Sequence, residues 1–164
     1  LPVKSVKELI AYAKANPTAL NYGASSNAVA LPMELFKTMT GTSIVHIPYK
    51  GAAPALSDLV GGQIQVMTAA SIAAVPFIRS GKLRALAIGD SKRSPNMPDL
   101  PTVAEAGVPG YHAVIWSGMF APAGTPRAII TRLNQDVAQA LHSPDLKERL
   151  QQLGGNPVGG TGDV

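Results

Sequence analysis

The sequence predicts an α/β fold in which a mainly parallel sheet is flanked by helices. Two observations indicate this class. Short apolar segments rich in β-branched residues alternate with segments of helical periodicity through most of the 164 residues, as expected for repeated β–α–β units. Helix start and stop signals separate these segments, and the chain shows no internal repeat or low-complexity tract. The length suits a single domain or one large lobe.

Five segments have the composition of strands, with turn residues on either side. They are residues 20–23 (LNYG), 43–49 (SIVHIPY), 64–70 (IQVMTAA), 83–89 (LRALAIG) and 112–123 (HAVIWSGMFAPA). Because a helical segment follows most of them, successive strands are expected to run parallel in one sheet.

Capping residues indicate where the helices begin and end. Ser5 and Glu8 have capping-box spacing, which predicts a helix from about Val6 to Ala15. Three further helices are expected in the segment MELFKTM up to Gly41, at 52–60, and from an N-cap at Ser71 to a stop at Gly81. A short helix is expected after the Thr102–Glu105 capping box. The last two are expected after Thr125, with Pro126 at the first helical position, and after Ser143, with Pro144 there.

Two prolines lie inside expected helices, where proline cannot donate a backbone hydrogen bond. Pro32 therefore predicts either that the preceding turn extends to about Ala28 or that the helix bends there. Pro76 predicts a kink or a late helix start.

Composition excludes several classes of function. The chain has no cysteine, which removes thiol catalysis, cysteine zinc sites and disulfides. Lys and Arg number 14 against 10 Asp and Glu, a net charge of +4, but the basic residues are scattered and locally dense only at 91–94 (SKRS). Without a basic stripe no nucleic-acid partner is expected; the charge suits anionic small molecules or serves only solubility. No stretch approaches the ~18 apolar residues of a membrane span, so the chain is not expected to be membrane-embedded.

The turn after the first expected strand is the strongest candidate for a binding site. Parallel sheets bind ligands beyond the carboxyl ends of their strands, and the start of a helix offers unpaired N–H groups to an anion. Here the turn consists of small and polar residues, namely Gly23, Ala24, Ser25, Ser26 and Asn27. The alternative is that Ser26 or Asn27 only caps the following helix.

Two further turns at the same edge are weaker candidates. One consists of Tyr49, Lys50 and Gly51, and Lys50 could supply a positive charge near the site. The other follows the third expected strand and consists of Thr68, Ala69 and Ala70. Taken alone, the first is equally explained as a solvated lysine before a helix, and the second as a strand end before an N-cap.

The sequence contains no recognisable set of catalytic or metal-binding residues. Three histidines, His46, His112 and His142, are far apart and show no metal-ligand spacing. No nucleophile elbow, Walker loop or dinucleotide fingerprint occurs. Tyr111 and Trp116 can wall a pocket, although an aromatic residue in an apolar segment is by default part of the core. No catalytic residue, metal or cofactor is therefore expected.

Three long motifs occur in order along the chain: VHIPYKGAAPAL (45–56), KLRALAIGDSKRSP (82–95) and PTVAEAGVPGY (101–111). With LPVKSVKELIAYAKANP before them and APAGTPRAIITRLNQDVAQAL after them, they resemble the tripartite tricarboxylate transporter receptor family, the Bug or TctC-type solute-binding proteins. The resemblance implies a periplasmic, monomeric receptor of two α/β lobes that closes on a small carboxylate. It also implies that residues 1–164 are a ligand-binding second lobe without leader, first lobe or last helix, and that residues 112–164 cross toward the first lobe.

The resemblance also implies a site. In such receptors the segment matching Gly23–Asn27 binds a ligand carboxylate through backbone N–H and hydroxyl groups, and the segment matching Thr68–Ala70 contacts the rest of the ligand. Ala69 replaces a residue that is often acidic or polar, which argues against an amino-acid ligand. Pro32 replaces a histidine or another polar residue, which is expected to change the size or chemistry of the ligand.

The expected function is capture of a small carboxylate for delivery to membrane transport subunits. Two alternatives stay open: a ligand-sensing partner of a histidine kinase, and an α/β enzyme acting on carboxylate or acyl substrates. The enzyme alternative lacks a histidine partner for Ser25 and Ser26. The isolated chain is expected to bind ligand weakly and to self-associate.

Overall fold

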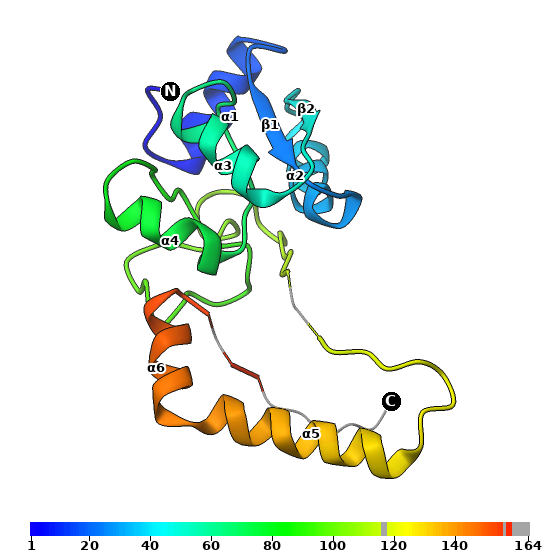
Figure 1. Cartoon of the computed structure of the whole chain (residues 1–164). Coiled ribbons are helices and arrows are strands. Elements are labelled where there is room, and N and C mark those ends of the chain that lie inside the picture. The colour runs from blue at the N-terminus through cyan, green and yellow to red at the C-terminus, as the bar shows by residue number, and fades with distance from the viewer. Residues whose placement is uncertain (116–117, 156, 159–164) are drawn as a thin grey trace. The chain divides into compact units, whose positions relative to one another are not determined.

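The computed structural model describes residues 1–115, 118–155 and 157–158 (Figure 1). The chain divides into two compact units, Leu1–Ile115 and Trp116–Val164, and each is described on its own. The first unit contains α1 (Val6–Ala15), β1 (Asn21–Ala24), α2 (Asn27–Thr40), β2 (Val45–Pro48), α3 (Ala52–Val60) and α4 (Ser71–Arg79). The second contains α5 (Arg127–His142) and α6 (Pro144–Gln152). The predicted alternation of strands and helices is confirmed from α1 to α3, whereas no strand separates α3 from α4.

Strands β1 and β2 form a parallel pair, as predicted, in the register that runs from Asn21 opposite Val45 to Ala24 opposite Pro48. Hydrogen bonds extend the pairing at both ends. The amide of Val45 donates to Leu20 O at 2.9 Å, and that of Tyr49 donates to Ala24 O at 2.9 Å. Because the pair is parallel and in register, both strands end at the same edge, and α2 and α3 both begin there (Figure 1).

The third, fourth and fifth predicted strands do not form in the described residues. Segment 64–70 lies beside β1 through a single bridge between Tyr22 and Val66. Segment 83–89 makes a single bridge from Ile88 to Thr102. Segment 112–123 has no strand at 112–115 or 118–123, and Trp116 lies outside the described residues. An apolar run indicates burial, but a strand also requires backbone pairing with a neighbouring strand at successive residues. Segments 64–70 and 83–89 are each paired at a single position.

Most predicted helix starts are confirmed, and two are corrected. Ser71 is the first residue of α4 rather than its N-cap, which is Ala70. The N-cap of α5 is Pro126, one residue later than predicted, and the Thr125 hydroxyl instead donates to Pro122 O at 2.8 Å. The other prediction about this region holds, since Ser143 is the N-cap of α6 and Pro144 its first residue. Proline at the start of a helix loses no helical hydrogen bond.

Two sequence signals give a different length of helix from the one predicted: the Thr102–Glu105 capping box is followed by less helix, and α2 extends further than Pro32 indicated. Thr102 and Glu105 exchange both capping-box hydrogen bonds, at 2.9 and 3.1 Å, but only a turn follows them. Conversely, α2 begins at Asn27, so Pro32 lies well inside the helix and the turn does not extend to Ala28. α2 ends as predicted, with Gly41 in the left-handed conformation at φ 64°.

The core of the first unit lies where α1 and α2 pack around β1. It consists mainly of buried apolar side chains from these elements and from the segment before residue 112: Val6, Leu9, Ala13, Leu20, Tyr22, Met33, Phe36, Ile44, Val108 and Tyr111. Full burial of a valine, leucine, isoleucine, methionine or phenylalanine side chain contributes ~1.5–3 kcal/mol to stability. Tyr111 is part of this core, and its ring lies edge-on to Phe36.

Gly89→Ala tests how segment 83–89 is held. The Ala113 amide donates to Gly89 O at 2.8 Å, and a Cβ at Gly89 would overlap the carbonyl oxygen of Ala113. We expect Gly89→Ala to lower the free energy of unfolding by ~1–3 kcal/mol, measured by urea denaturation. Gly51→Ser is the control, since a Cβ at Gly51 would meet nothing closer than Pro54 Cδ at 3.8 Å and serine is favoured at the N-cap position that Gly51 occupies before α3. Equal stability of the two variants would contradict the close approach.

Candidate functional site

Three connections meet at the edge where β1 and β2 end. Residues 25–26 join β1 to α2, and residues 49–51 join β2 to α3. The third connection, 67–70, leads from the segment beside β1 to α4, and a hydrogen bond from Thr68 Oγ1 to Val29 O at 3.1 Å ties it to the first turn of α2. The structure thus brings the three predicted turns to one edge of the first unit, with the start of a helix after each.

Gly23 allows the first two connections to approach each other closely. A Cβ at Gly23 would lie 2.6 Å from Ile64 Cδ1 and 3.0 Å from Tyr49 Cε2. The Tyr49 ring therefore lies against the β1 backbone, and Ala24 beside it is buried. Glycine suits this position because a larger side chain would press on Ile64 and Tyr49, and not because of its backbone conformation.

The first turn of α2 combines a side-chain cap with free amides. Ser26 has extended backbone angles, and its Oγ accepts from Val29 N at 3.4 Å, so Ser26 does cap α2. Ligand binding by Ser26 in addition stays a prediction. The cap uses one lone pair, so the Ser26 hydroxyl proton can still be donated. Within the described residues, the amides of 25–28 have no recorded acceptor. Ser25 is half-buried, whereas Ser26 and Asn27 are exposed, so an anion can reach these donors.

The turn after β2 presents a rigid aromatic side chain and a free cation. The Tyr49 hydroxyl donates to Asp58 Oδ2 at 2.7 Å, and this donated bond to a carboxylate raises the pKa of Tyr49. Lys50 is exposed and forms no ion pair with any described residue. Gly51 is the N-cap of α3 and, lacking a side chain, leaves the amides of that helix start uncapped. This turn can add one positive charge beside the α2 donors.

The third turn is less polar than the other two. The Thr68 hydroxyl is half-buried and directs its hydrogen at Val29 O. Ala69 is half-buried and Ala70 is exposed at the N-cap of α4. These two methyl side chains provide an apolar surface next to the donors of α2. A ligand contact by Thr68, Ala69 or Ala70 stays a prediction.

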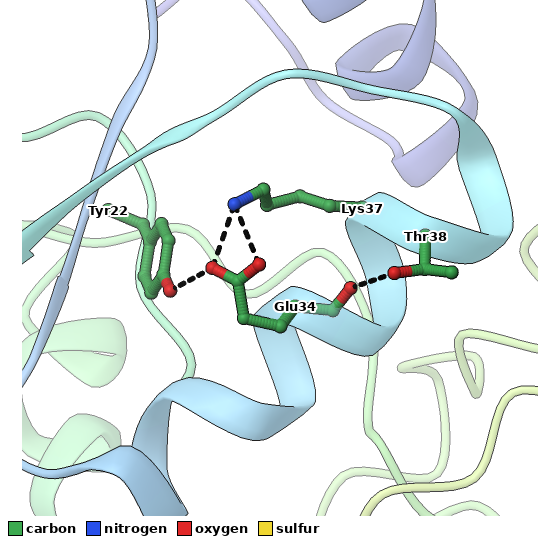
Figure 2. A network of polar contacts seen from close by, with 4 residues as sticks. All are labelled: Tyr22, Glu34, Lys37 and Thr38. Carbon is green, nitrogen blue, oxygen red and sulfur yellow. Dashed lines mark hydrogen bonds and ion pairs between the residues drawn. The ribbon is translucent and has the colours of Figure 1, made fainter.

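Sequence reasoning missed a polar network on α2 (Figure 2). The buried Tyr22 hydroxyl donates to Glu34 Oε1, and Lys37 Nζ donates to both Glu34 oxygens at 2.7 and 2.8 Å. Burial and the Glu34 bond raise the pKa of Tyr22. The bond from Lys37, followed by that from Tyr22, lowers the pKa of Glu34. The i, i+3 spacing of Glu34 and Lys37 could have indicated the pair, but no sequence pattern indicated Tyr22.

His46 packs against this network rather than at a metal site. Its ring stacks on Tyr22 with centroids 4.8 Å apart and an interplanar angle of 17°. Among the described residues, no group of three or more His, Asp or Glu side chains could hold a metal ion. No helix in the described part of the chain is long and apolar enough to cross a membrane.

Comparison with known proteins identifies the family, because the sequence matches the tripartite tricarboxylate transporter family receptor over residues 1–163. The chain belongs to this receptor family. Protein BugT of Bordetella pertussis is 41% identical to the receptor chain over 165 residues, covering 99% of the chain and 51% of BugT. The predicted family is therefore confirmed.

Solved structures show the same relationship. Rpa4515 of R. palustris, solved with adipate, gives a TM-score of 0.94 at 44% identity, covering 99% of the receptor chain and 55% of that protein. MatC from Rhodopseudomonas palustris, with bound malate, gives a TM-score of 0.83 at 37% identity, covering 93% of the receptor chain and 53% of MatC. The receptor chain spans about half the length of these relatives. It has the α/β architecture of one lobe of a periplasmic binding protein.

Tyr22→Phe tests the polar network of the receptor chain. We expect the loss of the hydroxyl to lower the free energy of unfolding by ~0.5–1 kcal/mol at neutral pH, the lower part of the usual range for a hydrogen bond, because the Glu34 side chain is 45% exposed. The folded-state pKa of Glu34 is lowered, so the stability from its charged form is present above the ordinary value of 4.5 and is lost as the pH falls through the folded pKa.

The difference between Tyr22→Phe and the parent should therefore shrink as urea unfolding is repeated at falling pH. Tyr12→Phe is the control, because the Tyr12 hydroxyl is half-buried without a recorded hydrogen bond to the described residues. A difference for Tyr22→Phe that is constant with pH would contradict the assignment of its bond to the Glu34 carboxylate.

Proposed function

We propose that the chain is the ligand-binding second lobe of an extracytoplasmic receptor that captures a small organic acid through donors at the start of α2. The observation that carries the proposal is the group of amides at 25–28, which have no protein acceptor among the described residues and belong to residues that are half-buried or exposed. Adipate and malate, with which the two R. palustris relatives were solved, are both dicarboxylic acids and support the same ligand class here.

The energetics favour a carboxylate at this position. Hydrogen bonds to a charged group contribute ~1.5–3 kcal/mol each, and a helix start adds a partial positive charge. Neutral donors bring no counter-ion that must be dehydrated with the ligand. Lys50 then contributes long-range attraction from an exposed position. Gly23, Ala24, Ser25, Ser26 and Asn27 would form the carboxylate subsite, and Tyr49, Lys50, Gly51, Thr68, Ala69 and Ala70 would flank it.

We infer that the receptor works in the periplasm, as relatives described as periplasmic proteins do. The family description supports delivery of the ligand to membrane transport subunits. Closure of two lobes around the ligand would be the hinge motion of periplasmic binding proteins. The second lobe would supply the donors at the start of α2, and the rest of the site would come from a lobe outside these 164 residues.

The apolar side of α5 supports a role for residues 112–164 in contact with that other lobe. Ile130, Leu133, Val137 and Leu141 recur at helical spacing, yet neither α5 nor α6 buries a residue. A stripe of this kind requires a partner surface, and we propose that the first lobe of the receptor provides it.

Ser26→Asp and Ser26→Asn form a matched pair that tests the carboxylate subsite. Both side chains can cap α2 as serine does, so stability should change little. Only aspartate places a negative charge where the ligand carboxylate is proposed to bind. We expect Ser26→Asp to weaken adipate binding at least tenfold relative to Ser26→Asn, measured by NMR titration. Equal affinity of the two variants would contradict the proposed subsite, as would a screen in which no carboxylate binds.

The stripe on α5 predicts self-association of the isolated chain. Sedimentation should show concentration-dependent oligomers together with weak adipate binding, because the other half of the proposed site would come from the first lobe. Leu133→Glu should shift the chain toward monomer, since it places a charge in the stripe. Gln135→Glu is the control, because it adds the same charge at an exposed position on the other side of α5. A monomeric parent with tight ligand affinity would contradict this prediction.

A further inference from the structure

Two side-chain hydroxyls from distant parts of the chain bind backbone carbonyls near the start of α2. Thr68 Oγ1 donates to Val29 O at 3.1 Å, and Tyr111 Oη donates to Pro32 O at 2.9 Å. The two donors are separated from their acceptors by 39 and 79 residues in sequence. The Tyr111 side chain is buried in the core, and burial raises its pKa, so its hydroxyl stays protonated and able to donate at neutral pH.

Pro32 explains why these bonds matter at this place. Proline has no N–H, so Ala28 O lacks the helical hydrogen bond that residue 32 would otherwise donate. The first turn of α2 is therefore joined to the rest of the helix by one bond fewer than usual. Thr68 binds a carbonyl on the N-terminal side of this weak point, and Tyr111 binds the carbonyl of Pro32 itself.

We propose that Thr68 and Tyr111 are positioning residues that hold the first turn of α2, and with it the amides of 25–28, in place for a carboxylate. This inference rests on the proposed function, and it gives Thr68 a role through α2 rather than through contact with the ligand. A donor hydrogen already directed at Val29 O is not available to an anion. Holding the donors in place in the absence of ligand reduces the ordering that binding would otherwise require.

Amide hydrogen exchange tests the positioning without any ligand. The Ala30 amide donates to Ser26 O at 3.0 Å at the fourth position of α2, and the Leu9 amide donates to Ser5 O at 3.0 Å at the same position of α1. Thr68→Val and Tyr111→Phe should each speed exchange at Ala30 about two- to tenfold, as expected for the loss of one hydrogen bond, while exchange at Leu9 is unchanged.

Two matched variants separate positioning from general stability. Thr68→Ser keeps the hydroxyl and should restore the parent exchange rate at Ala30. Thr38→Val removes a hydroxyl that donates to Glu34 O at 2.9 Å, within α2 itself and further along the helix (Figure 2), and should leave Ala30 unchanged. The positioning role is wrong if Ala30 exchange is unchanged in both Thr68→Val and Tyr111→Phe, or if Leu9 exchange rises by the same factor.

Adipate titration of the same variants connects the positioning to the proposed function. Thr68→Val and Tyr111→Phe should bind adipate about two- to tenfold more weakly, with Thr68→Ser and Thr38→Val close to the parent. Faster Ala30 exchange with unchanged affinity would overturn the role in binding. If the parent binds no carboxylate, the proposed function fails, whereas the exchange rates still decide whether these hydroxyls hold α2.

Discussion

The parallel pairing of β1 with β2 is the constraint on which the candidate site depends. Four residue pairs in register place Ala24 opposite Pro48, so both strands end at one edge. An antiparallel pair would bring the end of one strand to the beginning of the other, and the starts of α2 and α3 would lie at opposite edges. Gly23 suits this arrangement, because a Cβ there would press on the Tyr49 ring and on the end of the Ile64 side chain.

Local chemistry explains which parts of the fold could be predicted. The start of α1 follows from the Ser5 cap, and the end of α2 follows from Gly41, because each signal acts within a few residues. Segments 64–70 and 83–89 have strand-like composition, but whether a strand forms depends on a neighbour distant in sequence. Each finds one at a single bridge. The Thr102–Glu105 capping box shows the converse, since its bonds form without a helix to continue them.

The candidate site follows the same division. A strand end followed by a helix start could be predicted around residues 23–27 because capping signals act locally. The structure places Gly23 and Ala24 in β1, makes Ser26 the N-cap and begins α2 at Asn27. Ligand binding by these residues stays a prediction. The partners that hold α2 could not be predicted. Tyr22, Thr68 and Tyr111 are distant in sequence from the parts of α2 that they bind. Each is a common residue type, and its hydroxyl finds an acceptor on α2 only once the chain has folded.

The distribution of acidic residues at helix starts adds an argument about what the edge attracts. An acidic side chain in the first turn stabilises a helix through its dipole, and α1 and α6 carry one, Glu8 and Asp145. None of α2, α3 and α4 does. α5 also lacks one, so this absence alone does not distinguish a site. At α2 it coincides with the amides of 25–28, which have no acceptor in the described part of the chain, and Glu34, in the second turn of that helix, is paired with Lys37. The start of α2 therefore keeps its partial positive charge uncompensated by the protein, which is the condition for an anion from solution to bind there.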